Sequence, residues 1–394
     1  MHHYAALFMA FFSMSELLEL PEKWVHRSKA YGDYFEYYLS QDTIDRQVAQ
    51  ETNWNALFAG RYDFLARMDR GNMWPLYREC PAIDALPIAN PFEQILSEAA
   101  PFRVLAFNED HQELRQRYFL LENLETFWKA GYRHLGYEAF FLEDTRDGGD
   151  LSGSLGYYFN DPVMAATLRK AHAFGFEIFG YESKRPRQAE MDWAEAQNTR
   201  EAGQAERVAR YLERIPDGEK VLLWAGGHHI SKRTDQTLEG RSIVWMAARL
   251  KRDHKIEAYS VDLTNCQYQA VSEQAVAKAY QNADGIWAVS DLFAEWGVDA
   301  QLHLPVVTEN GFTPGQYRKH IGDKFTVPSE LRELADTVFI QAFQPDQEET
   351  ATAYDSILMF NGEILPLYLP KGTFKLVAYA SDGARLGDTL ITVE

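Results

Sequence analysis

The sequence predicts an α/β protein with a mainly parallel sheet and helices on both of its faces. Strand-like and amphipathic helical segments alternate from Phe102 onward, which is the pattern of βαβ units. Before that point the chain lacks strand-like alternation, and its last stretch holds only strand-like segments joined by glycine turns. We therefore expect a helical segment packed on the core at residues 1–100, an α/β core domain carrying the site at 101–325, and a small antiparallel, all-β module at 330–394.

The core domain is expected to begin with a buried strand at residues 102–108, whose sequence FRVLAFN is almost wholly apolar. Further strands are predicted at residues 133–140, 176–183, 220–230, 255–263, 284–291 and 300–307. Helices are predicted at residues 112–131, 161–176, 192–215, 242–254 and 272–281. Asp161 and Pro162 suit the start of the second helix, because an acidic cap followed by proline is favoured there.

The C-terminal module is predicted from three strand-rich segments, at residues 336–344, 356–370 and 372–394. Asn-Gly, Lys-Gly and Asp-Gly pairs separate the strand patterns, and such pairs favour tight turns between antiparallel strands. No helix is expected after about Leu334.

Composition excludes several classes of partner. The 394 residues carry a formal net charge of −19, so a nucleic-acid partner is not expected, because phosphate binding needs a basic surface. Docking on anionic lipid is disfavoured for the same reason. With 46% hydrophobic residues, the chain can form a substantial core, and we expect a small-molecule or peptide ligand.

The N-terminus and the cysteines give weaker indications. The apolar run 5–12 has the length of a signal-peptide core, but no Lys or Arg precedes it. Export to the periplasm or outside the cell is one interpretation; a cytoplasmic protein whose first helical turn packs on the body is the other. No stretch is long enough to span a membrane. Only Cys80 and Cys266 occur, which excludes a zinc ribbon or a disulfide scaffold.

Acids or histidines stand at the carboxyl ends of four predicted strands. In strand order these are Glu109 with His111, Glu138, Glu182, and His228 with His229. In a parallel α/β sheet, functional groups gather at this edge. We therefore expect these side chains to converge there.

Two chemistries suit such a group. Glu109 and His111 are two residues apart, so in extended backbone they point to the same side. In the first chemistry, His111, His229, Glu109 and Glu138 bind a divalent metal and leave a position for water. In the second, no metal is needed: a histidine activates water or an alcohol, and a glutamate orients the histidine. The residues alone leave both open.

These motifs resemble the superfamily that joins erythromycin esterases, ChaN-like haem-uptake lipoproteins and TIKI metalloproteases, most of all its ChaN-like members of unknown activity. Glu109 and His111 match the first motif, although Asn108 stands where glycine is usual. Glu138 matches the second motif. The sequence GGHH at 226–229 matches the third, which favours His229 over His228.

The resemblance adds two arginines and three mechanisms. The segment TREAGQAERVARYL is similar to an esterase helix that places an arginine toward the site, which makes Arg200 a candidate for substrate binding, and Arg117 a weaker one. The esterase branch implies a metal-independent hydrolase, the TIKI branch a metal-dependent one, and the haem-uptake branch haem binding. Asn108 favours a fourth case, in which the site has decayed.

Three hypotheses follow. The first is a hydrolase in which His111 is the general base or a metal ligand. Glu109 and Glu138 would orient it or bind the metal, and His229 would polarise the substrate, with His228, Glu182, Arg200 and Arg117 binding it. The second is a haem- or metal-binding protein without turnover. The third is a structural or interaction protein in which the β module is the working part.

Overall fold

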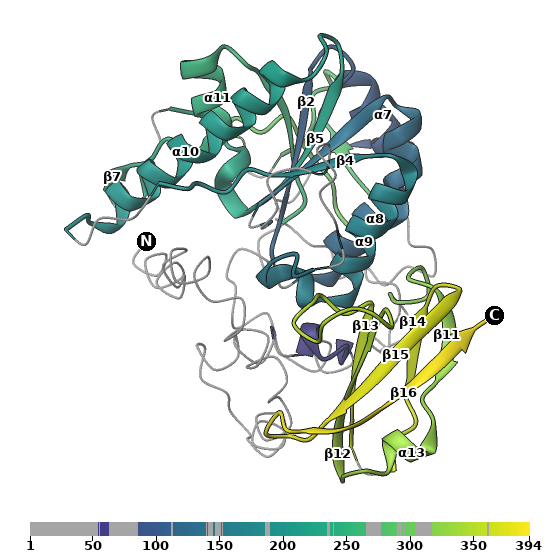
Figure 1. Cartoon of the computed structure of the whole chain (residues 1–394). Coiled ribbons are helices and arrows are strands. Elements are labelled where there is room, and N and C mark those ends of the chain that lie inside the picture. The colour runs from purple at the N-terminus through teal and green to yellow at the C-terminus, as the bar shows by residue number, and fades with distance from the viewer. Residues whose placement is uncertain are drawn as a thin grey trace, which may run out of the picture.

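The structure is a computed structural model (Figure 1), and it describes residues 54, 56–62, 86–111, 113–138, 140, 145, 151, 153–185, 190–234, 237–238, 240–264, 277–289, 294, 296–304, 317–360 and 362–394. Its centre is a six-stranded parallel sheet with the order β10-β8-β2-β5-β3-β4. In chain order the strands are β2 (Val104–Glu109), β3 (Tyr132–Tyr137), β4 (Glu177–Gly180), β5 (Lys220–Gly226), β8 (Ala258–Asp262) and β10 (Ala300–Gln301). The predicted α/β class is confirmed.

Helices cover both faces of this sheet (Figure 1). The helices on one face are α7 (Pro91–Glu98), α8 (Leu114–Lys129) and α9 (Pro162–Phe174). The other face packs against α10 (Trp193–Arg214) and α11 (Met246–His254). Alternate side chains of each strand enter the two apolar layers, as parallel sheets buried on both faces require.

Local sequence explains where these helices begin and end. Asp161 accepts a hydrogen bond from the backbone N–H of Val163 at 3.1 Å, and so caps α9 at its predicted start. Gly175 ends that helix with a φ of 97°, a left-handed conformation that favours glycine. Asp192 and Glu195 form a reciprocal capping box at the start of α10.

The C-terminal module consists of two antiparallel sheets. One has the strand order β13-β12-β15-β16, and the other pairs β11 with β14. The elements are β11 (Asp323–Thr326), α13 (Ser329–Arg332), β12 (Thr337–Phe343), β13 (Asp355–Phe360), β14 (Pro366–Leu369), β15 (Gly372–Tyr379) and β16 (Arg385–Val393). The hairpin pattern predicted for this segment is present. The whole of β11 and the first residue of α13 lie before residue 330.

In the four-stranded sheet of this module, β12 and β13 are buried on both faces, whereas the edge strand β16 is largely exposed. Val338 and Ile340 face the smaller sheet and belong to the core of the module. Phe339 and Phe343 point the other way and belong to the same apolar cluster as α8 and α9. The module is therefore packed against the α/β core, and Figure 1 shows the two side by side.

Two predicted elements differ in the structure. Of the expected helix at 272–281 only residues 277–281 are described, and they are extended: β9 (Tyr280–Gln281) pairs antiparallel with β1 (Leu86–Pro87). Within the expected strand at 284–291, the described residues form only a single bridge, from Trp287 to Gln281. Apolar periodicity over so few residues does not separate helix from strand.

A further short antiparallel pair consists of β6 (Thr237–Leu238) and β7 (Arg241–Ser242).

Most of the predicted N-terminal part lies outside the described residues. This includes the apolar run 5–12, Cys80, and most of the helical segment expected at 1–100; Cys266 also lies outside. In the part of the chain that is described, no helix is both long and apolar enough to cross a membrane.

Candidate functional site

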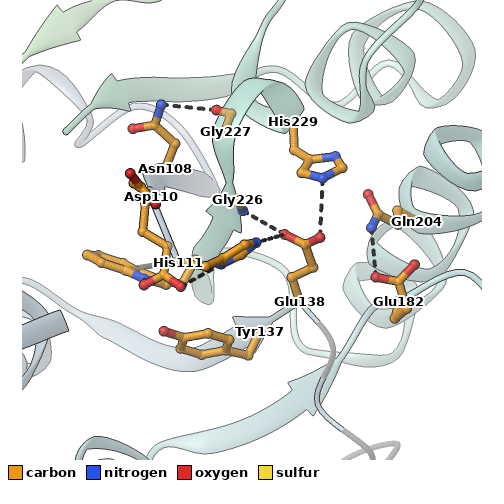
Figure 2. Close-up of polar contacts among 12 residues, drawn as sticks. Asn108, Asp110, His111, Tyr137, Glu138, Glu182, Gln204, Gly226, Gly227 and His229 are labelled. Atoms are coloured by element: carbon orange, nitrogen blue, oxygen red, sulfur yellow. Dashed lines mark hydrogen bonds and ion pairs between the residues drawn. The ribbon is translucent and has the colours of Figure 1, made fainter. Parts of the chain in front are cut away.

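The structure brings six of the eight predicted side chains together at the carboxyl edge of the parallel sheet, several of which are labelled in Figure 2. The six are Glu109, His111, Glu138, Glu182, Arg200 and His229, linked by hydrogen bonds and ion pairs. They come from the ends of β2, β3, β4 and β5, and from α10. Arg117 lies behind this group. His228 instead contacts the rings of Trp245 and Trp296.

Glu109 and His111 form a closely paired carboxylate and imidazole. The carboxylate Oε1 of Glu109 lies 2.8 Å from Nδ1 of His111, and its Oε2 accepts a hydrogen bond of 2.6 Å from the Trp224 indole. Burial alone would raise the pKa of Glu109, but the charge of Arg117 and the hydrogen bond to His111 hold it below its usual value. An ionised carboxylate at Nδ1 fixes a proton there, so Nε2 of the neutral ring is an acceptor.

The ring of His111 is also held in its plane. Tyr158, in the short helix η3 (Tyr157–Asn160), stacks on the imidazole with ring centroids 4.2 Å apart and planes 19° apart. The side chain of His111 remains 13% exposed, while Glu109 is fully buried. The pair is thus fixed on its Glu109 side, and part of the imidazole remains exposed.

Glu138 is the centre of the second half of the site. Its Oε2 accepts a hydrogen bond of 2.6 Å from the backbone N–H of Gly226 and lies 3.9 Å from Nε2 of His111. Its Oε1 lies 3.2 Å from Nε2 of His229 and also binds the Arg200 guanidinium. Burial alone would raise the pKa of Glu138, but the charges of His229 and Arg200 hold it well below its usual value.

His229 lies between two carboxylates. Its Nδ1 lies 2.8 Å from Oε1 of Glu201 and its Nε2 faces Glu138. Burial alone would lower the pKa of His229, but the charges of Glu138 and Glu201 and their hydrogen bonds raise it to about 10. The imidazole is therefore a cation at neutral pH. By contrast, burial and the charge of His229 lower the pKa of His228 to about 3.

Arg200 joins the third strand end to this network. Its guanidinium binds Glu182 through Nε at 2.9 Å and through a second nitrogen at 2.7 Å, and it also binds Glu138. Glu182 accepts a further hydrogen bond of 3.1 Å from Gln204, one turn along α10. Arg200 and His229 together place two cations beside Glu138. Arg200 lies within α10.

A glycine allows the two halves of the site to approach. A Cβ atom on Gly226 would stand 2.3 Å from Nε2 of His111 and 3.0 Å from Oε2 of Glu138. Any side chain there would displace the imidazole or the carboxylate. The first glycine of the GGHH sequence is thus explained by the space that His111 needs.

Asn108, which stands where the resemblance expected glycine, ties three strand ends together. Its Nδ2 donates to the carbonyl of Gly227 at 3.0 Å and to Oδ1 of Asp262 at 2.8 Å, and its Oδ1 accepts from the backbone N–H of Leu263 at 2.7 Å. The side chain is fully buried. Asn108 is therefore a structural bridge between β2, β5 and β8 rather than a sign of a missing glycine.

Arg117 is fully buried rather than open to a substrate. Its guanidinium binds Asp161 at 2.7 Å, approaches Glu109 at 3.5 Å and donates to the carbonyl of His111. Burial alone would lower the pKa of Arg117, but the charges of Glu109 and Asp161 raise it above its usual value. Its contacts are those of a support for the Glu109–His111 pair.

Sequence reasoning missed four supporting residues: Trp224, Tyr158, Glu201 and Asp161. Glu201 is next to the predicted Arg200 in the chain, and Trp224 is two residues before Gly226 in the motif-bearing strand. Either could be found by asking which neighbours satisfy a buried histidine or carboxylate. Tyr158 and Asp161 carry no such signal, because Tyr158 lies in the short helix η3 and Asp161 is the N-cap of α9.

The donor set does not fit a divalent ion as it is arranged. Both oxygens of Glu138 and both ring nitrogens of His229 are already engaged, and the Arg200 guanidinium lies 3.2 Å from Nε2 of His229. Across the residues with described positions, no three His, Cys, Asp or Glu side chains are grouped as metal ligands. A cation already fills the centre of the site.

Comparisons with known proteins give distant structural likeness only. No protein-family model matches the chain, and no curated protein matches it. The solved structures found include RRSP, a MARTX toxin effector domain from Vibrio vulnificus CMCP6, with 17% identity and a TM-score of 0.32 over 54% of this chain and 40% of that one. The type III effector HopBA1 has 13% identity and a TM-score of 0.35 over 58% of this chain and 98% of that one.

A third match is the C-terminal region of Pasteurella multocida toxin, described as having a thiol-protease like catalytic triad, with 11% identity and a TM-score of 0.32. It covers 93% of this chain and 53% of that one. This chain spans about two fifths of the RRSP chain. TM-scores of this size do not establish a common function.

These findings correct the expected family. The three structures named above are bacterial toxin or effector proteins, and none of the three is an erythromycin esterase, a ChaN-like lipoprotein or a TIKI protease. The interpretations that depended on that resemblance, haem binding among them, lose their support. The Glu/His site at the strand ends stands on its own geometry.

Proposed function

We propose that the chain is a hydrolase that cleaves an ester or amide bond of a small molecule or peptide without a metal ion. The observation that carries the proposal is the orientation of His111. Its Nδ1 is bound by a buried carboxylate, and its Nε2 faces the two cations His229 and Arg200 across Glu138. A fixed base opposite fixed positive charge is what addition of water to a carbonyl requires.

The reaction steps follow from these groups. His111 takes a proton from water at Nε2, and the hydroxide forms a bond to the carbonyl carbon of the substrate. The negative charge that develops on the carbonyl oxygen is stabilised by the cations His229 and Arg200. When the bond to the leaving group breaks, the imidazolium of His111 returns the proton to the leaving oxygen or nitrogen. Glu109 keeps the ring oriented and stabilises its charged form.

The acidic partners have a separate purpose. Glu138, Glu182 and Glu201 hold the two cations His229 and Arg200 close together, although their like charges repel each other in this poorly solvated site. They also fix the positions of both cations before a substrate arrives, so that little reorganisation is needed during the reaction.

The test is hydrolysis measured on a panel of p-nitrophenyl esters and a proteome-derived peptide library, in H₂¹⁸O, after dialysis against EDTA. We expect one ¹⁸O in each carboxylate product and unchanged turnover after chelation. His111→Ala should lower turnover at least about 100-fold, because general base catalysis contributes roughly 10²–10⁴-fold. His172→Ala, at an exposed histidine in the last turn of α9, is the matched control. Turnover that survives His111→Ala, or that EDTA abolishes, would refute the mechanism.

A further inference from the structure

A buried chain of hydrogen bonds runs from the Glu109–His111 pair to Tyr62, a residue far away in the sequence. The Tyr62 hydroxyl donates to Oδ1 of Asp161 at 2.7 Å. Oδ2 of Asp161 binds the Arg117 guanidinium at 2.7 Å. Arg117 in turn donates to the carbonyl of His111 and approaches Glu109 at 3.5 Å.

The three side chains that connect the turn to the pair are shielded from water. The side chains of Tyr62, Asp161 and Arg117 have no measurable exposure. Burial and the charge of Asp161 raise the pKa of Tyr62 well above its usual value, so its hydroxyl stays a donor. Hydrogen bonds in such surroundings are strong, and their loss leaves a polar group without its partner.

The C-terminal β module holds the turn that carries Tyr62. The backbone N–H of Leu358 in β13 donates to the carbonyl of Ala59 at 3.0 Å. Arg61 binds Glu363 at 2.7 Å and the carbonyl of Leu358 at 3.2 Å. In Figure 1 the short purple segment that ends at Tyr62 lies beside β13.

Glycine makes this contact close. Gly60 has a φ of 64°, and a Cβ atom there would stand 2.2 Å from the carbonyl oxygen of Ser356. The turn and the strand therefore touch backbone to backbone. A shift of β13 would move Tyr62 with it.

We propose that Tyr62 is a positioning residue for the Glu109–His111 pair, acting through Asp161 and Arg117, and that the β module serves the site by clamping the turn of Tyr62. The inference rests on the proposed function for its catalytic consequence. The geometric part, that Tyr62 fixes His111, stands apart from it. In this proposal the β module stabilises the position of His111 through Tyr62.

The first measurement needs no substrate. Diethyl pyrocarbonate reacts with the accessible nitrogen of a neutral imidazole, and its rate at His111 can be followed at pH 7.5 by peptide mapping. In Tyr62→Phe, which keeps the ring and removes one hydroxyl, we expect His111 to react at least about threefold faster. Tyr259→Phe is the matched control: its hydroxyl donates to Glu98 at 2.6 Å, on the side of the sheet facing α7. It should leave the rate unchanged.

The second measurement is turnover of the best substrate found in the hydrolase panel. Tyr62→Phe should lower kcat about tenfold, equivalent to about 1.4 kcal/mol, with KM within about twofold, because substrate contacts are untouched. Tyr259→Phe should change neither constant. A purely structural loss would raise the rate of modification at other buried histidines, such as His134, as well as at His111.

A milder variant covers the case in which Tyr62→Phe fails to fold. Glu363, the partly exposed partner of Arg61, is a milder target, because Glu363→Gln weakens this ion pair. We expect the reaction rate at His111 to rise and kcat to fall, each by about twofold. Glu349→Gln is its control, since Glu349 binds Tyr379 and Arg385 on the module.

Unchanged reactivity of His111 in Tyr62→Phe, or an equal change in Tyr259→Phe, would overturn the inference. If the wild-type protein hydrolyses nothing, the proposed function fails while the modification rates still decide the positioning role.

Discussion

Replacing Glu201 by glutamine should remove a pH-dependent part of the stability of the protein. His229 has a pKa of about 10 in the folded protein and an ordinary value of 6.5. The difference, about 3.5, corresponds to roughly 5 kcal/mol of folding free energy at 1.36 kcal/mol for each pKa unit. Because the folded value is the higher one, this stability is fully present below pH 6.5 and is lost as the pH rises toward 10.

Glu201 supplies one of the two carboxylates that raise this pKa, and it also accepts a hydrogen bond of 2.7 Å from the backbone N–H of Met246. Glutamine can keep the bond to Met246 but removes the charge. We expect Glu201→Gln to lose roughly half of the effect, about 2–3 kcal/mol at pH 7. Near pH 10 the gap between the two proteins should shrink to under about 1 kcal/mol.

The assay is urea unfolding at a series of pH values from 6 to 10, comparing the free energy of unfolding of wild type and variant. Other ionisable groups are common to both proteins and cancel in the difference. Glu206→Gln, on the same helix, is the control: its ion pairs with Arg185 and Arg210 are at the surface, so a change within about 0.5 kcal/mol is expected. A gap that stays constant from pH 6 to 10 would refute a raised pKa at His229.

Three further predictions concern the packing of the site. Gly226→Ala should lower turnover at least about 100-fold by displacing His111. Gly153→Ala should retain full turnover, because a Cβ atom there meets nothing within 4 Å. Equal activities of the two variants in the hydrolysis assay would contradict the steric explanation. Asn108→Gly should lower the free energy of unfolding by about 2–4 kcal/mol, because the buried groups of Asp262 and Leu263 lose a hydrogen bond. A neutral result in urea would show that glycine suffices there. Arg117→Met should cost about 3–5 kcal/mol in the same assay, since it leaves buried carboxylates uncompensated, and a loss below 1 kcal/mol would exclude a supporting role.

The sequence predicted the parallel sheet and the convergence of its strand ends because both depend on short-range patterns. The run from Val104 to Glu109 is apolar until it reaches the sheet edge, and helices with clear periodicity follow and precede the other strands. Parallel strands then bring their carboxyl ends to one edge whatever the details of the connections. Glu109, Glu138 and His229 could be found in this way.

The supporting residues could not be predicted, because they depend on tertiary placement. Tyr158 reaches His111 from a short helix in a connection, and Tyr62 reaches Asp161 from a turn whose place is set by β13. Neither residue differs in sequence context from an ordinary aromatic core residue. The prediction of a helix at 272–281 was wrong at its described end for a related reason. There, pairing with β1 makes the chain extended.

The burial of β12 on both of its faces also bears on how such a protein can be assembled by recombination. The side of β12 that carries Phe339 and Phe343 would lie bare if the α/β part were exchanged for another, and the facing surface of α9 would lie bare in turn. Cutting the chain just before β11 would thus yield two fragments with complementary apolar faces. Each would be prone to aggregate alone. We therefore expect recombination to transfer the α/β part and the β module together, as one unit.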